Sequence, residues 1–175
     1  FYELCDSLGF YFYDEANLGE REKDLRAKLY ELLKTYLDGE APSPGCYPPG
    51  NVLACTWDPQ IIYKVGEALG EEAVRYKISC LLGTPNVNLL RDPRNGRFFE
   101  GYSEDPYLAG VLGSSLVKGV NSRGVASNVK HFAANNLEKN RVGIDETIPV
   151  RALEELYLPA FRECVKAGAS SVMAA

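Results

Sequence analysis

Histidine, paired cysteines and long apolar runs are scarce or missing in this sequence, and each absence argues against a class of protein. The chain of 175 residues has a single histidine, His131, which disfavours most three-ligand metal sites and most mechanisms that use several histidines. Its five cysteines are widely spaced, so they predict neither a disulfide framework nor a zinc site and are expected to be reduced packing residues. We therefore expect chemistry that needs no metal and no cofactor.

No segment approaches the roughly 18 consecutive apolar residues of a membrane span. The N-terminus also shows no basic leader followed by an apolar core, so we expect a soluble protein without a membrane partner and favour a cytoplasmic location. With 19 Lys and Arg against 24 Asp and Glu, the formal net charge is −5. This balance disfavours a nucleic-acid partner, because phosphate contacts need clustered Lys and Arg.

Strand-like and helix-like segments alternate along the chain. Strands are predicted at residues 8–14 and 78–82, which are short apolar runs, at residues 125–132, whose last residues are polar, and at residues 170–173. Apolar residues at three- and four-residue spacing predict amphipathic helices, which lie at residues 25–38, 59–76, 106–120 and 150–165. Asp58 and Asp105, each followed by proline, support two of the helix starts, because Asp accepts a backbone N–H and Pro fits the first turn.

This alternation predicts an α/β fold with parallel strands and helices outside them, as a β/α barrel or a doubly wound sheet. The sequence contains neither Gly-x-Gly-x-x-Gly nor a Gly-Lys-Ser/Thr phosphate loop, which favours the barrel over a nucleotide-binding sheet. Four strand–helix pairs are about half of an eight-fold barrel, whose usual length is ~250 residues. We therefore predict a single domain over residues 1–175 that is a partial (β/α)8 TIM-type barrel.

The densest polar segment runs from residue 88 to residue 105 and includes Arg97 and Glu100. One interpretation is a solvated loop whose arginines and carboxylates pair with each other. The other is a rigid loop at the carboxyl end of a strand, where guanidinium groups donate hydrogen bonds to a polyhydroxylated ligand. Sequence physics alone leaves both open.

A second polar group, Lys130 and His131, ends the strand predicted at residues 125–132. In a regular strand these neighbours would point to opposite sides, unless the backbone bends. As an isolated pair they would be surface and packing residues. Polar residues at the carboxyl ends of barrel strands form the active-site rim, however, and their position therefore makes them candidates for a binding site.

Three long motifs occur in the same order, and at similar spacing, as the motifs of a known enzyme family. They are RDPRNGRFFEGYSEDPYLAG, KGVNSRGVASNVKHFAANNLEKNR, and LEELYLPAFRECVKAG followed by SSVM. Residues from about 51 to 173 thereby resemble the N-terminal barrel domain of glycoside hydrolase family 3, chiefly β-glucosidases. We accordingly divide the chain into an atypical N-terminal part, residues 1–50, and a family 3-like part, residues 51–175.

The resemblance implies a retaining glycosidase with an aspartate nucleophile, a separate acid/base carboxylate, and a barrel that binds the non-reducing sugar. Arg97, Lys130 and His131 match positions that bind ring hydroxyls in the family. Asp38 is similar to the sugar-binding aspartate of the family's Asp-Gly-Pro motif, although Glu40 stands where that motif has Pro. These four residues are the predicted substrate-binding residues, and the expected partner is a β-glucoside or related sugar.

The family's nucleophile lies in a Ser-Asp-Trp-like segment after the strand that begins SSVM, and this sequence reaches Ala175 before such a segment. No catalytic residue is therefore assigned. The first eighteen residues, FYELCDSLGFYFYDEANL, are instead similar to a barrel strand of family 2 β-galactosidases. That likeness would place Asp14, Glu15 and Asn17 near the rim, whereas the simpler interpretation is that they end a strand and cap the next helix.

Three functions remain open from the sequence. The first is a glycoside hydrolase barrel fragment that binds the non-reducing sugar, with its nucleophile segment missing from these residues. The second is a non-catalytic carbohydrate-binding or scaffold protein derived from such a barrel. The third is an inactive fragment that associates with itself or with a complementary barrel fragment, because half a barrel leaves strand edges unpaired.

Overall fold

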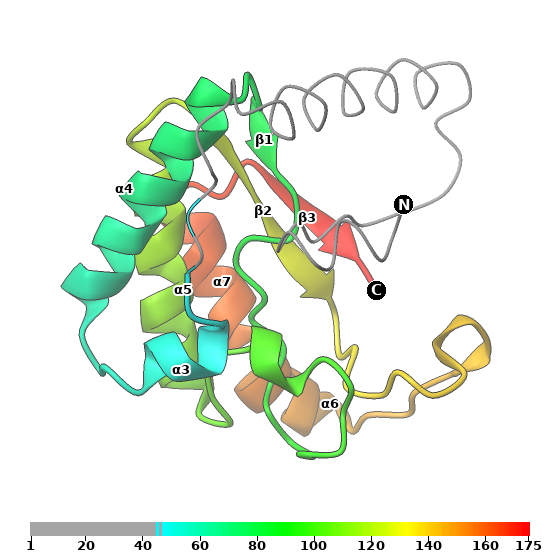
Figure 1. Ribbon diagram of the computed structural model, residues 1–175. Helices are drawn as coiled ribbons and strands as arrows, with labels where there is room; N and C mark the ends of the chain where they lie inside the picture. The colour runs from blue at the N-terminus through cyan, green and yellow to red at the C-terminus, as the bar shows by residue number, and fades with distance from the viewer. Residues whose placement is uncertain (1–44, 46) are drawn as a thin grey trace, which may run out of the picture. The chain divides into compact units, whose positions relative to one another are not determined.

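The computed structural model describes Gly45 and residues 47–175, and Tyr47–Ala175 forms one compact unit (Figure 1). Several predictions fall on the other residues and lie outside the described part. They are the strand at residues 8–14, the helix at residues 25–38, and the candidate residues Asp14, Glu15, Asn17 and Asp38.

Within residues 47–175, three parallel strands form a sheet in the order β1-β2-β3. They are β1, Cys80–Leu81, β2, Ala126–Phe132, and β3, Ser171–Ala174. The parallel arrangement and all three predicted strands of the described part are confirmed. β1 is shorter than the predicted 78–82, and Gly83 follows it with a φ of 68°, a left-handed conformation that glycine adopts easily and that turns the chain out of the strand.

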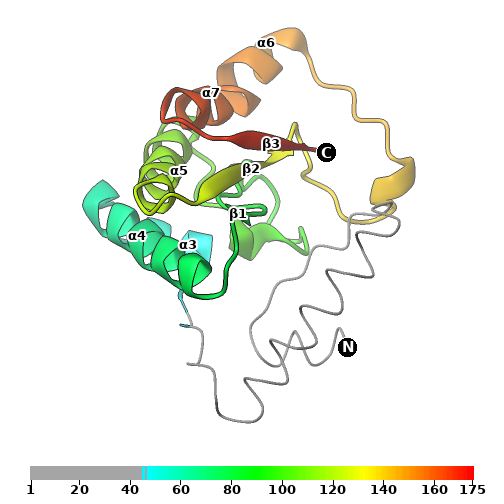
Figure 2. The same cartoon turned by 90° about the horizontal axis from the view of Figure 1, so that it is seen from above.

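Helices cover one face of this sheet, as Figures 1 and 2 show. The main ones are α4, Pro59–Arg75, α5, Pro106–Asn121, and α7, Pro159–Lys166. Both predicted caps are confirmed, since Asp58 accepts a hydrogen bond from the Gln60 N–H and Asp105 accepts one from the Tyr107 N–H, each at 2.8 Å. A short helix, α3, Gly50–Ala54, precedes α4 and was not predicted from the sequence.

The helix predicted at residues 150–165 is interrupted, and the prediction of one continuous helix is wrong. It consists of α6, Val150–Ala152, a π-helical turn η3, Leu153–Tyr157, and α7. Proline at 159 has no N–H to donate to the preceding turn. The neighbouring Leu158 N–H instead donates to the Leu153 carbonyl at 3.0 Å, the five-residue step of a π-turn.

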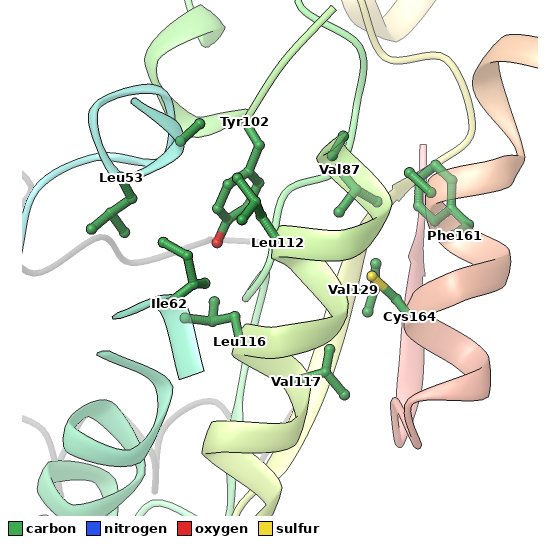
Figure 3. Close-up of a cluster of buried hydrophobic side chains, with 13 residues drawn as sticks. Leu53, Ile62, Val87, Tyr102, Leu112, Leu116, Val117, Val129, Phe161 and Cys164 are labelled. Atoms are coloured by element: carbon green, nitrogen blue, oxygen red, sulfur yellow. The ribbon is translucent and has the colours of Figure 1, made fainter. Parts of the chain in front are cut away.

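The hydrophobic core lies between α5 and its neighbours (Figure 3). Ile62 of α4, Leu112 and Val117 of α5, and Val129 of β2 are fully buried. Helices α4 and α5 approach closely at Gly66, where an added Cβ would lie 2.6 Å from the Leu116 carbonyl oxygen. This contact requires glycine, and it fixes the position of α5 against α4.

The cysteines behave differently from one another. Cys164 is fully buried, and burial raises the pKa of its thiol to about 12, so it is the packing residue that the sequence predicts. Cys55 is exposed, so the same prediction is wrong for this residue. Its sulfur lies at the end of α3 and donates a hydrogen bond to the Asn51 carbonyl at 3.3 Å.

Candidate functional site

A polar cluster forms where the carboxyl end of β2 meets the long loop that follows β1. The loop contributes Arg97 and a single 3-10 turn, η1, Phe98–Glu100, which lies by the end of β2 in Figure 1. The strand contributes Lys130 and His131. Side chains at the carboxyl ends of parallel strands and in the following loops form the functional rim of β/α folds, so this cluster is the candidate site.

The Glu100 carboxylate joins the two cations of the cluster. Its Oε1 lies 2.7 Å from Arg97 Nε, and its Oε2 lies 3.0 Å from Arg97 Nη2 and 2.8 Å from Lys130 Nζ. Burial alone would raise the pKa of Glu100, but the hydrogen bonds from Arg97 and Lys130 outweigh it and hold the pKa below its usual value. Glu100 is therefore an anion that fixes both cationic side chains, which come from two different elements.

His131 is held by Asn88 through both its backbone and its ring. The His131 N–H donates to Asn88 Oδ1 at 2.9 Å, the Asn88 Nδ2 donates to the His131 carbonyl at 2.9 Å, and the ring Nδ1 lies 3.0 Å from Asn88 Oδ1. Burial, together with the positive charges of Arg97 and Lys130, lowers the pKa of His131 to about 3. The imidazole is therefore neutral at physiological pH.

The end of β2 departs from a regular strand. Its register with β3 is irregular between Val129 and Phe132. The regular alternation that would send these neighbours to opposite sides does not apply, and Lys130 and His131 are both only 3% exposed. The structure thus brings Arg97, Lys130 and His131 together, whereas Asp38 lies outside the described residues.

Further charged residues extend the cluster toward the next loop. Glu138 Oε1 lies 3.8 Å from Arg97 Nη1, and Glu138 Oε2 lies 3.3 Å from Nη1 of Arg141. Arg141 begins a second 3-10 turn, η2, Arg141–Gly143. Arg97 therefore contacts two carboxylates, one on each side of its guanidinium.

The sequence did not single out Asn88, Glu100 or Glu138 as site residues. Glu100 could have been found, because it follows Arg97 by three positions and a single helical turn brings such residues together. Asn88 carries no such signal. Its partner, His131, is 43 residues away, and only the pairing of the two chain segments brings them into contact.

One hollow lies within the cluster, and a second is lined by other residues of the loops that follow β1 and β2. A cavity of about 10 Å³ is lined by residues that include Asn86, Asn88, Arg97 and His131, and this volume is enough for about one water molecule. A more open hollow of about 490 Å³ is lined by residues that include Arg91, Arg94, Asn136 and Glu146. The cavity beside Arg97 and His131 is too small for a sugar ring.

Within the described ranges, no three His, Cys, Asp or Glu side chains gather in a way that could hold a metal ion. No helix in that part of the chain combines the length and the apolar character needed to cross a bilayer.

Comparison with known proteins decides the family. The profile of the glycosyl hydrolase family 3 N terminal domain matches residues 39–175. This chain belongs to glycoside hydrolase family 3. The match covers all the described residues, so the parallel strands and outer helices are part of that domain's TIM-type barrel, and the prediction of a partial barrel is confirmed.

Relatives in the family include enzymes with different names. The chain is 49% identical over 133 residues to exo-alpha-(1->6)-L-arabinopyranosidase of Bifidobacterium breve, which covers 76% of this chain and 17% of that enzyme. It is 47% identical over 121 residues to thermostable beta-glucosidase B of Acetivibrio thermocellus, covering 69% of this chain and 16% of the enzyme.

Solved structures agree with this family assignment. Beta-glucosidase 3B of Thermotoga neapolitana in complex with alpha-D-glucose is similar with a TM-score of 0.72 and 46% identity, over 74% of this chain and 18% of that one. Beta-glucosidase of Kluyveromyces marxianus in complex with glucose gives a TM-score of 0.72 at 42% identity, over 74% of this chain and 16% of that one. The chain thus spans about one sixth of the length of these proteins.

Proposed function

We propose that this chain provides the sugar-binding part of a retaining, β-glucosidase-like glycoside hydrolase, and that Arg97, Lys130 and His131 orient the non-reducing sugar. The observation that carries the proposal is the cluster around Glu100, in which residues from two elements are tied together at the carboxyl end of β2. That position is where β/α barrel enzymes bind their substrates.

The chemistry of the cluster suits a neutral ligand with many hydroxyl groups. The Arg97 guanidinium and the Lys130 ammonium carry several N–H donors each, and Glu100 offers carboxylate acceptors between them. Because Glu100 balances one of the two positive charges, the cluster is less cationic than a phosphate site would be. Vicinal hydroxyls can donate and accept together, which matches this mixture of donors and acceptors.

The proposal assigns no nucleophile to the 175 residues. Retaining hydrolysis uses two carboxyl groups ~5–5.5 Å apart, one that attacks and one that cycles between acid and base. Glu100 is held as an anion between Arg97 and Lys130, an environment that favours a positioning role over attack. We place the nucleophile and the acid/base residue in other parts of the protein, and we propose Asp38 as a further sugar-binding residue.

The substrate that we propose is a β-glucoside or a related pyranoside. Two of the similar structures hold glucose, and several relatives are named beta-glucosidases. The relative in Bifidobacterium breve is named for an arabinopyranoside, which has a pyranose ring as well. The proposal therefore concerns the class of sugar, and the ring hydroxyls are the groups recognised.

The test is a glucose titration of the chain and of three variants, Arg97→Ala, Lys130→Ala and His131→Ala. Each lost charge-assisted hydrogen bond is worth ~1.5–3 kcal/mol, so the two cationic variants are expected to bind roughly ten- to a hundredfold more weakly. Arg151→Ala is the matched control, because Arg151 is 85% exposed, pairs with Glu155 and lines neither hollow. Unchanged affinity in all three site variants would contradict the proposal.

A second candidate is a carbohydrate-binding or scaffold protein that does not turn over its ligand. It is favoured by the pairing of Glu100 with two cations, which provides binding groups and leaves that carboxylate without a catalytic role. Turnover of an aryl β-glucoside by the whole protein distinguishes the two functions. Binding without turnover supports the second.

A further inference from the structure

Asn88 contacts His131 at three atoms, and two of these contacts fix the orientation of the Asn88 amide. The His131 carbonyl can only accept a hydrogen bond, so the group 2.9 Å from it must be the NH₂, Nδ2. The His131 backbone N–H can only donate, so the group 2.9 Å from it must be the oxygen, Oδ1. The backbone alone therefore determines which end of the amide is which.

The same oxygen determines the protonation of the ring. Asn88 Oδ1 lies 3.0 Å from His131 Nδ1, and an amide oxygen has no proton to give, so the proton of this hydrogen bond must belong to Nδ1. We infer that Asn88 fixes His131 in the tautomer protonated on Nδ1, so that Nε2 of the neutral ring is a hydrogen-bond acceptor. Asn88 is thus a positioning residue that acts through His131.

The surroundings of the ring keep it neutral and so preserve this tautomer. His131 is 3% exposed, and burial disfavours the charged imidazolium. Arg97, Lys130 and Arg141 add positive charge that opposes protonation further, whereas the Glu100 carboxylate favours it and is outweighed. Nε2 therefore stays an acceptor across the neutral pH range.

This assignment has a consequence for ligand selection, which rests on the proposed function. Arg97 and Lys130 can only donate hydrogen bonds, whereas Nε2 of His131 can only accept one. Nε2 is itself buried, so a sugar hydroxyl that reached it on binding would have to act as donor. A fluorine or a methyl ether at that position carries no proton and would leave a buried acceptor facing another acceptor, so such an analogue binds more weakly than the parent sugar.

The tautomer can be measured on the chain itself, because His131 is its single histidine and gives one set of imidazole resonances. After labelling with 15N-histidine, two-bond 1H–15N correlation spectra recorded from pH 8 to pH 4 distinguish a protonated Nδ1 from a protonated Nε2. The expected result is the pattern of protonated Nδ1 without titration in this range. A protonated Nε2, or a titration near the ordinary value of ~6.5, overturns the inference.

Two variants separate the effect of Asn88 from general packing. Asn88→Asp keeps an acceptor opposite Nδ1 and adds a negative charge, so the tautomer is expected to persist while the pKa of His131 rises. Asn88→Leu removes the acceptor, so the preference for protonated Nδ1 is expected to disappear. If both variants show the wild-type tautomer and pKa, Asn88 does not control the ring.

Asn86→Asp is the matched control. Asn86 is also buried, and its Oδ1 accepts a hydrogen bond from the Asn88 N–H at 3.1 Å, so the change adds the same charge nearby without removing the contact to the ring. We expect the tautomer to be unchanged and the pKa of His131 to rise less than in Asn88→Asp, and an equal rise would contradict a direct effect of Asn88.

The spectrum of the unaltered chain tests the inference even if a variant does not fold. Failure of sugar binding with the protonated Nδ1 pattern intact would contradict the proposed function and leave the tautomer assignment standing.

Discussion

Replacing Glu100 by Gln removes the anion that joins the loop after β1 to the end of β2. The carboxylate accepts hydrogen bonds from Arg97 Nε, Arg97 Nη2 and Lys130 Nζ at 2.7, 3.0 and 2.8 Å. The side chains of Arg97, Glu100 and Lys130 are only 13%, 15% and 4% exposed. In the variant, Arg97 would keep only the longer contact with Glu138, and the largely buried Lys130 would lose the Glu100 carboxylate.

The expected loss follows from these contacts. Breaking a fully buried ion pair by removing one partner costs ~3–5 kcal/mol. Glu100 is slightly exposed and Gln keeps one acceptor oxygen, so we expect Glu100→Gln to lower the free energy of unfolding by ~2–3 kcal/mol. For a unit of this size the melting temperature would fall by roughly 5–15 °C.

Thermal and urea unfolding of the chain, followed by circular dichroism at pH 7, measure this loss. Glu163→Gln is the control, because Glu163 pairs with Lys166 on the surface of α7, where the two side chains are 47% and 63% exposed. Exposed pairs contribute ~0–1 kcal/mol, so the control is expected to change little. A loss in Glu100→Gln no larger than that of the control would refute the view that Glu100 holds the cluster together.

Three further predictions concern pH, turnover and association. The pKa of His131 is about 3 in the folded chain and ~6.5 in the unfolded chain. As the pH falls, the unfolded state therefore binds the proton at a higher pH than the folded state does. Stability is therefore expected to fall as pH drops from 6.5 toward 3; urea unfolding of His131→Gln is expected to depend less on pH in this window, and an equal dependence would contradict the assignment. The 175-residue chain alone is expected not to hydrolyse aryl β-glucosides at the rate of a complete enzyme, and sustained release of aryl alcohol by a pure sample would contradict this. Because half a barrel leaves strand edges unpaired, light scattering is expected to show association that grows with protein concentration. A monomer at all concentrations would contradict this prediction.

Much of the described fold could be predicted from local patterns. α5 has an Asp-Pro start and an apolar stripe, and both lie where the sequence places them. The limits of β2 differ from the prediction by a single residue, at the end of the strand that follows Gly124. Such signals lie within a few residues of the structure that they determine.

Other features could not be found in this way. Pro159 interrupts a helix whose apolar spacing continues across it, so the periodicity hides the break. For Arg97, the sequence left open whether it pairs within its loop or offers donors to a ligand. The structure shows that Arg97 pairs with Glu100 inside the loop. Glu100 also contacts Lys130, which belongs to β2, and no local pattern encodes this second contact.

The central claim is that a sugar binds at the cluster of Arg97, Lys130 and His131. The most direct measurement is a glucose titration of the 15N-histidine-labelled chain, in which the imidazole resonances of His131 report binding at that site. The account predicts a saturable change in these resonances, with an affinity roughly ten- to a hundredfold weaker in Lys130→Ala and unchanged in Arg151→Ala. Resonances of His131 that do not respond to glucose, or an affinity that Lys130→Ala leaves unaltered, would contradict it.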